Sequence, residues 1–242
     1  MEKTVSEAIA YRRSTRIYQN IPIDTEKVKQ CLYNATLAPT SSNLQLWEFY
    51  HITTKETLSK MAEACFNQNA AKTAQQLVVV VARKDLWRKR AKANIDFLNN
   101  VFDKSNLEER LLKRKQQALS YYSKLIPTIY TDFLGIIGYV KYIAFQVTGL
   151  FRPIYRQARH SDMRIVAHKS AGLAAQNFMI SMAAIGYDTC PMEGSDTLRV
   201  KRILNLPRSA EINMVIGCGI RDKSGIYGPR FRVPFEEVYF EL

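Results

Sequence analysis

Basic side chains suited to binding an anion gather in two short segments far apart in the chain. Residues 12–16 read Arg-Arg-Ser-Thr-Arg, and residues 230–232 read Arg-Phe-Arg. Guanidinium groups match the oxygens of a phosphate, and residues two apart in an extended loop point the same way. Both segments therefore indicate a phosphate site. The alternatives are a solvated helix end, where basic residues complement the helix dipole, and an exposed arginine pair.

Two polar turns have groups that suit the edge and the face of a flat ligand. Residues 38–47, Ala-Pro-Thr-Ser-Ser-Asn followed by Leu-Gln-Leu-Trp, offer hydroxyls and turn amides. Residues 186–196 contain a Pro-Met-Glu-Gly turn, whose backbone N–H groups are exposed in succession and whose glycine permits close approach. The alternatives are an ordinary turn between helix and strand, and a helix-to-helix connection with Asp196 as the N-cap.

Several other chemistries are disfavoured. The four cysteines are far apart and form no CxxC pair, and no GxGxxG or Walker loop is present. No pair among the three histidines has metal-ligand spacing, so we expect no metal. The N-terminus has no apolar segment typical of a secretory signal, which favours a reducing, cytoplasmic compartment.

The pattern of apolar residues predicts an α+β protein. Thr4 and Glu7 fit a capping box, and a second helix is expected from Asp24 to Ala38. Further helices are expected at 55–66, 86–125, 162–185 and 196–204. Strands are expected at 47–53, 77–82 and 212–218, with 233–242 extended.

The excess positive charge is concentrated in the middle of the chain. The protein has 242 residues and a net charge of +13, and residues 83–159 hold 16 basic and 6 acidic side chains, which leaves +10. Within this cassette, residues 126–151 are almost entirely apolar. The favoured interpretation is a hydrophobic lid and dimer-packing element with a solvated basic face, and peripheral contact with an anionic membrane surface is the alternative.

Taken in order, the four chemical segments resemble the flavin-dependent nitroreductase family. The family pattern runs from Arg-x-Ser-x-Lys/Arg through Ala-Pro-Ser-Ser-x-Asn-x-Gln-Pro-Trp to a helix ending in Gly-x-x-x-x-Pro-x-x-Gly, and then to a C-terminal basic pair. The resemblance covers about 1–82 and 162–242. Leu46 stands where the family has proline, and the region 83–159 is longer and more basic than its family counterpart.

The resemblance implies a nitroreductase-like fold with a central mixed sheet flanked by helices, forming an interlocked homodimer. Residues 1–242 would be a single domain with the cassette inserted at about 83–159. FMN would lie at the dimer interface, held by residues of both subunits. The candidate cofactor-binding residues are Arg12, Arg13, Ser14, Arg16, Pro39, Thr40, Ser41, Asn43, Gln68, Lys72, Pro191, Met192, Glu193, Gly194, Arg230 and Arg232.

Each group has an implied role. Arg12, Arg230 and Arg232 would bind the phosphate. Ser14 and Arg16 would reach the ribityl chain and the N1/C2=O edge of the flavin. Pro39, Thr40, Ser41 and Asn43 would come from the partner subunit. The turn 191–194 covers one flavin face, with the backbone of Glu193 and Gly194 near N5. Gln68 lies at the pyrimidine edge, where Asn67, Asn69 and Lys72 compete for nearby roles. No side chain is expected to act as a nucleophile, because the cofactor carries the chemistry.

The implied activity is a ping-pong transfer of a hydride from NADH or NADPH, through flavin N5, to a nitroaromatic, a quinone or a similar small-molecule acceptor. Dehalogenation or flavin cleavage on the same fold remains open, as does a protein that binds flavin or an anionic membrane surface without turnover. Residues 83–125 are basic enough for nucleic acid but match no known recognition motif, so no nucleic-acid partner is expected.

Overall fold

A four-stranded sheet forms the centre of the computed structural model, which describes residues 2–102, 109–133 and 135–242. Its strands are β1 (Trp47–Ile52), β2 (Gln76–Ala82), β3 (Asp188–Met192) and β4 (Glu211–Gly219), in the order β1-β2-β4-β3. Neighbouring strands pair antiparallel throughout, so the expectation of a mixed sheet is wrong for these strands. A parallel pairing does occur as an isolated bridge between Ser14 and Thr189.

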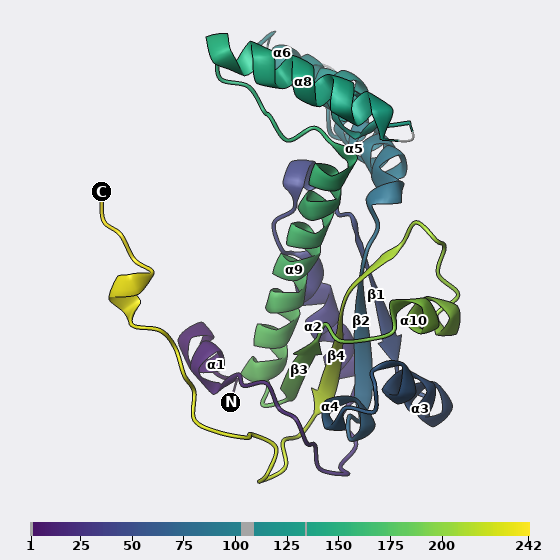
Figure 1. Cartoon of the computed structure of the whole chain (residues 1–242), viewed down its shortest axis with the longest axis vertical. Coiled ribbons are helices and arrows are strands. Elements are labelled where there is room, and N and C mark those ends of the chain that lie inside the picture. The colour runs from purple at the N-terminus through teal and green to yellow at the C-terminus, as the bar shows by residue number, and fades with distance from the viewer. Residues whose placement is uncertain (1, 103–108, 134) are drawn as a thin grey trace.

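Two hydrophobic layers cover the two faces of the sheet (Figure 1). On one face α2 (Thr25–Thr36) and α9 (His160–Ala184) pack against Val78 and Val80 of β2. On the other, α3 (Lys55–Ala64), α4 (Asn69–Lys72) and α10 (Thr197–Ile203) pack against Val79 and Val81. Because successive strand residues point to opposite faces, the run of valines fills both layers, as expected for a strand buried on both sides.

The helix starts follow the capping signals of the sequence. Thr4 accepts from the Glu7 amide at 3.4 Å and donates its own amide to the Glu7 carboxylate at 2.7 Å, so α1 (Val5–Tyr11) begins with the expected capping box. The carboxylate of Asp24 accepts from the amides of Glu26 and Lys27 at the start of α2. Asp196 caps α10 in the same way.

Helices above the sheet make up most of the basic cassette (Figure 1). They are α5 (Trp87–Val101), α6 (Glu109–Ser120), the π-helical turn η3 (Tyr121–Leu125), α7 (Ile126–Tyr130) and α8 (Ile136–Phe151). The expected helix at 86–125 therefore has several parts, and residues 103–108 of it lie outside the described residues. Short 3-10 turns occur at η1 (Ser41–Asn43), η2 (Lys84–Leu86) and η4 (Phe235–Glu237).

The sequence analysis missed β3, because Pro191 stands inside it and proline disfavours a strand interior. β3 is the last strand of the sheet, and edge strands are where proline is accepted within a sheet. The C-terminal end is extended as expected except for η4, and Figure 1 shows it running away from the body.

Candidate functional site

A cavity of about 270 Å³ brings together the two arginine segments that the sequence analysis singled out. Its walls come from the loop after α1 and from the loop after β4. Residues lining it include Arg12, Arg13, Ser14, Arg16, Arg230 and Arg232. Five guanidinium groups from opposite ends of the chain therefore border one concave space.

Backbone contacts between the two loops fix this arrangement. Arg13 donates through Nη2 to the carbonyl of Gly228 at 2.6 Å, and Arg230 donates to the carbonyls of Ala10 at 2.9 Å and Arg12 at 2.6 Å. The amide of Arg16 donates to the carbonyl of Gly225 at 2.7 Å. Arg230 thus satisfies carbonyls at the C-terminal end of α1, which have no partner inside the helix.

The cavity has a strong excess of positive charge. None of its five arginines forms an ion pair with a carboxylate in the described part of the chain. Burial and the nearby charges of Arg230 and Arg232 lower the pKa of Arg12. Repulsion among the arginines falls when an anion enters, so the geometry favours binding of a doubly charged phosphate.

A partly buried ion pair between Asp188 and Arg221 was not found from the sequence. The carboxylate of Asp188, which is 2% exposed, accepts from Nε of Arg221 at 2.7 Å and from the Arg221 amide at 2.9 Å. Arg221 also lies over the ring of Tyr11, with Cζ 4.0 Å from the ring centroid. The pair joins β3, the end of β4 and the end of α1. Asp188 stands in the segment 186–196 already singled out, whereas Arg221 lies outside the four chemical segments, so only their spatial proximity identifies the pair.

The Pro191–Gly194 turn lies beside Gln68. Gln68 donates through Nε2 to the carbonyl of Gly194 at 2.8 Å. The hydroxyl oxygens of Thr15, Thr189 and Ser195 are buried and have no hydrogen-bond partner in the described part of the chain. Thr189 and Ser195 flank the turn, and the Thr15 amide donates to the Thr189 carbonyl at 3.1 Å, so unsatisfied polar groups gather beside the turn.

Lys72 lies elsewhere. It borders a different cavity, of about 610 Å³, together with Tyr18, Asn20 and Thr73. Asn69 donates to the hydroxyl of Tyr227 at 3.2 Å, which directs it toward the loop after β4. Between these two neighbours of Gln68, the structure brings Asn69 nearer to the arginine cavity.

The polar loop at 39–43 lies at the far end of the sheet from this cavity. It leads into Trp47, which pairs with Ala82 at one end of β2, whereas Gln68 leads toward Gln76 at the other end. Six strand steps separate Gln76 from Ala82, roughly 20 Å at the usual rise. The amide of Ser41 donates to Oγ of Ser170 at 3.3 Å. Within one chain, the loop and the arginine cavity are therefore apart.

Backbone strain concentrates in the two loops predicted to meet the flavin. Positive φ values occur at Ser42 and Asn43 in the polar loop, and at Asn67 directly before Gln68. Residues other than glycine rarely adopt positive φ values, and backbone strain of this kind clusters at functional sites. Gln45, next to the unusual Leu46, also has a positive φ of 49°.

Comparison with known proteins identifies the fold and the family. The nitroreductase family model matches residues 9–220, and the chain belongs to this family. A Bacillus subtilis protein provisionally named NAD(P)H nitroreductase MhqN is 26% identical over 228 residues, 93% of this chain and 92% of the relative.

Solved structures agree with this assignment. YdfN of Bacillus subtilis, provisionally described as a nitroreductase, matches with a TM-score of 0.72 at 23% identity over 98% of both chains. A provisionally described nitroreductase from Exiguobacterium sibiricum, solved in complex with FMN, matches with a TM-score of 0.66 at 21% identity, over 99% of this chain and 98% of that one. The expected nitroreductase-like α+β fold is therefore confirmed.

The residues of this chain fit FMN. A dianionic phosphate would neutralise part of the five-arginine cavity, and the unpartnered hydroxyls of Thr15, Thr189 and Ser195 would meet polar atoms of the ligand. Gly194 has no side chain to obstruct a flat ring system.

Proposed function

We propose that the protein is a homodimeric, FMN-dependent NAD(P)H oxidoreductase that reduces a nitroaromatic, a quinone or a similar acceptor by a ping-pong mechanism. The observation that carries the proposal is the cavity lined by Arg12, Arg230 and Arg232, which joins both ends of the chain and holds no counter-charge among the described residues. When bound, FMN accepts a hydride from NADH or NADPH and passes it to the acceptor.

The chain's own residues bind and orient the cofactor in this proposal. Arg12, Arg230 and Arg232 hold the phosphate, with Arg13 fixing the loop around it. Ser14 and Arg16 face the ribityl chain and the N1/C2=O edge, where the permanently charged Arg16 stabilises negative charge. Gln68 and the backbone at Glu193 and Gly194 orient the ring system, and Pro191 and Met192 support that turn.

A second subunit completes the site. Pro39, Thr40, Ser41 and Asn43 are about 20 Å from the Gln68 end of their own sheet, so they reach a flavin only if a partner chain brings them there. Apolar side chains exposed along one side of the molecule supply an interface, including Val5 and Ile9 on α1 and Leu173 on α9. The exposed C-terminal tail from Phe231 to Leu242 fits an arm that lies on a partner.

All four cysteines are free thiols, which supports the expected reducing, cytoplasmic location.

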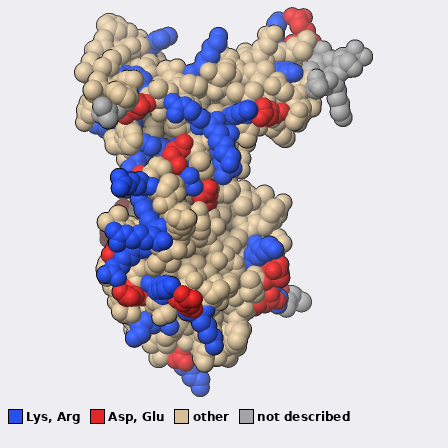
Figure 2. Space-filling view, turned by 90° about the vertical axis from the view of Figure 1, so that its right-hand side faces the viewer, with Lys and Arg blue, Asp and Glu red and all other residues tan. Residues whose placement is uncertain are grey.

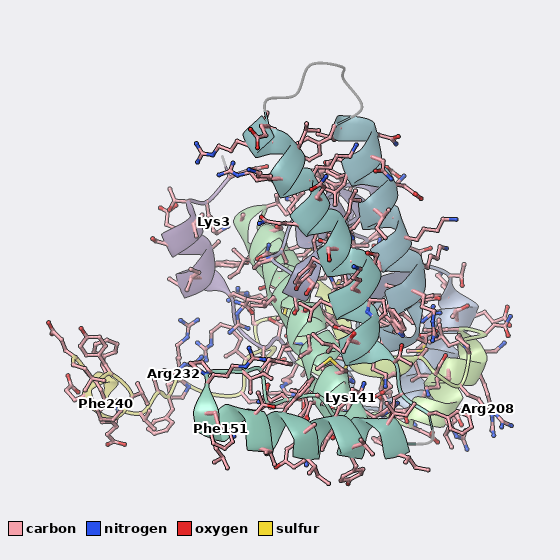
Figure 3. All side chains as sticks on the ribbon, turned by 90° about the horizontal axis from the view of Figure 1, so that it is seen from above. Lys3, Lys141, Phe151, Arg208, Arg232 and Phe240 are labelled. Atoms are coloured by element: carbon pink, nitrogen blue, oxygen red, sulfur yellow. The ribbon has the colours of Figure 1, made fainter. Side chains whose placement is uncertain are left out.

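Replacing one arginine tests the phosphate assignment. Arg232 donates only to the carbonyl of its neighbour Phe231 in the described part of the chain, so Arg232→Ala removes a cation with little effect on the fold. We expect the FMN dissociation constant to rise about 10- to 100-fold, as for loss of a charged hydrogen bond, while riboflavin binding changes little. The control is Arg208→Ala, an exposed arginine on the opposite side of the molecule in Figure 3.

Turnover tests the rest of the proposal. FMN-loaded protein is mixed with NADH or NADPH and with benzoquinone or nitrobenzene, and oxidation of each nicotinamide is followed by absorbance. Parallel lines in double-reciprocal plots support the ping-pong order. An equal loss of affinity for FMN and for riboflavin in Arg232→Ala would contradict the phosphate assignment. Flavin-loaded protein that oxidises neither nicotinamide would favour flavin binding without turnover.

A further inference from the structure

Helix α8 is attached to the molecule by its polar and glycine-bearing side. A Cβ on Gly138 would lie 3.2 Å from the amide nitrogen of His160, so this position faces the body closely. Lys141 donates through Nζ to the carbonyls of Thr128 at 2.9 Å and Ile129 at 3.1 Å. These positions lie three residues apart, on one face of the helix.

The same face continues to the end of the helix. Arg156 donates to Oε1 of Gln146 at 2.7 Å, and its guanidinium fills the space that a Cβ on Gly149 would occupy. Arg159 stacks on Tyr142, with Cζ 4.8 Å from the ring centroid. Cations and backbone groups, rather than an apolar seam, therefore hold α8 in place.

The opposite face of α8 is apolar and faces outward. Its large side chains have exposed fractions between 52% and 84%, and they are Ile136, Tyr139, Val140, Ile143, Val147, Leu150 and Phe151. Figure 3 shows α8 along the edge of the molecule, with Phe151 at its end. A surface helix of a globular protein normally turns its apolar stripe inward, and a contiguous exposed stripe marks an interaction surface.

Charge around the face indicates what covers it. The cassette that contains α8 has a net charge of +10, and α8 itself has no acidic residue. Arg152 is exposed just beyond its C-terminal end, while Lys141 and Arg156 lie on the polar inner face. Figure 2 shows Lys and Arg gathered where the upper and lower parts of the molecule meet, while wide areas of the upper part have neither. An apolar stripe bordered by cations complements an anionic lipid surface.

The depth of insertion is limited. Within the described ranges, no helix is long and apolar enough to cross a bilayer. Apolar side chains on a single face suit a helix that lies in the plane of the interface. The apolar residues proposed for dimerisation stand on α1, on α9 at Leu173 and on the C-terminal tail. Figure 1 shows α1 and the tail away from α8, and the start of α9 contacts α8 on its inner face. The outward face of α8 is therefore left for a different occupant.

We propose that the outward face of α8 is a docking surface for an anionic membrane, with the helix lying in the headgroup region. The apolar side chains enter the boundary of the acyl chains, and the cassette's arginines and lysines lie near the lipid headgroups. This inference concerns where the enzyme acts, and it stands independently of the flavin site.

Vesicle co-sedimentation tests the proposal with the full-length, flavin-loaded protein. One set of vesicles is pure phosphatidylcholine, and the other contains phosphatidylcholine with about 30% phosphatidylglycerol. Each set is used at about 0.1 M and 0.5 M salt. The test variant is Ile143→Ser with Val147→Ser on the outer face. The control, Phe97→Ser with Leu198→Ser, removes two equally exposed apolar side chains from α5 and α10. Circular dichroism, flavin content and sedimentation velocity are recorded for each.

We expect wild type to bind the anionic vesicles, to bind less at high salt, and to bind the neutral vesicles weakly. The partition coefficient of the α8 variant onto anionic vesicles should fall at least about tenfold, and that of the control should match wild type. No binding by wild type, or equal binding to both vesicles, would overturn the proposal. Dissociation of the α8 variant into monomers would show instead that a second copy of the chain covers this face.

Discussion

Nη2 of Arg221 lies 2.6 Å from Oδ1 of Asp188, and this contact ties three segments of the candidate site together. Asp188 begins β3, Arg221 follows β4, and Nη2 also donates to the carbonyl of Tyr11 at 3.2 Å. The loop from Arg12 to Arg16 starts directly after this point. The ion pair therefore positions the arginine cavity without lining it.

Asp188→Asn should destabilise the protein, because it leaves the guanidinium of Arg221 without a counter-charge. Allowing for the partial exposure of Arg221, we expect the free energy of unfolding to fall by about 2–3 kcal/mol, with weaker FMN binding. Urea unfolding followed by circular dichroism measures the first effect. Glu26→Gln breaks an ion pair with Lys29 that is largely exposed and should cause no measurable change. Equal stability of Asp188→Asn and wild type would show that the pair has no structural role.

The four cysteines should be inert in the native protein. Burial raises the pKa of the Cys31 and Cys65 thiols to about 11 and also raises the pKa of Cys190 and Cys218. At pH 8 roughly one thiol in a thousand is ionised at a pKa of 11, against about a quarter at the usual 8.5. We expect alkylation by iodoacetamide at least about 100-fold slower than in urea, monitored by mass spectrometry.

The same thiols give the stability a defined pH dependence. The unfolded chain loses these protons above about pH 8.5, while the folded protein retains them until about pH 11 for Cys31 and Cys65. Their contribution is therefore complete below pH 8.5 and is lost as the pH rises toward 11. Rapid labelling of any one cysteine at pH 7 would contradict its burial.

Local signals predicted much of the fold, because they act within a few residues. The capping box of Thr4 and Glu7, the Asp24 cap and the valine run of β2 all specify their own elements. Residue types indicated only an anion site at each arginine segment, and the resemblance to nitroreductases implied that the two segments share one phosphate. The Asp188–Arg221 pair was missed, because 33 residues separate its members and each is unremarkable alone.

The direction in which α8 faces also escaped the sequence analysis. Residues 126–151 are apolar enough to suit either a buried lid or a membrane contact. The inner face is defined by contacts of Gly149 and Gly138 with Arg156 and His160, which lie outside the helix and therefore leave no periodic signal within it. Similarly, Pro191 made a strand at β3 hard to predict. A proline is acceptable in an edge strand, but which strand lies at the edge depends on the order of the whole sheet.

Deleting residues 234–242 should weaken dimerisation while leaving the arginine cavity intact. The deletion removes Phe235, Val238, Tyr239 and Phe240, which are all exposed. Their burial against a partner would explain why a monomer exposes them. We expect a dimer dissociation constant at least about tenfold higher by sedimentation equilibrium, and FMN affinity that depends on protein concentration. Substituting Tyr33, which is exposed on α2, by phenylalanine is the control. An unchanged dimer with the tail removed would assign the interface elsewhere.

Tyr121 and Tyr122 tie the basic cassette to the strained polar loop. The hydroxyl of Tyr121 lies 2.6 Å from Oγ of Ser42, and the hydroxyl of Tyr122 donates to the Ser42 carbonyl at 3.0 Å. An adjoining cavity of about 240 Å³ is lined mainly by apolar and aromatic side chains, including Ile126 and Tyr130. In the proposed dimer this loop meets the partner's flavin, so the cassette would form the acceptor side of the site.

Replacing both tyrosines by phenylalanine should therefore affect the acceptor more than the cofactor. Each substitution removes one hydrogen bond that holds Ser42 at its positive φ. Because the loop is then less well fixed, we expect the KM for benzoquinone to rise about tenfold. The FMN dissociation constant should change less than about threefold, because in the proposed dimer the phosphate of that flavin is held by the arginine cavity of the partner subunit. Steady-state kinetics and fluorescence titration measure the two quantities, with Tyr33→Phe as the matched control. A large loss of FMN with an unchanged acceptor KM would show that the cassette serves cofactor binding instead.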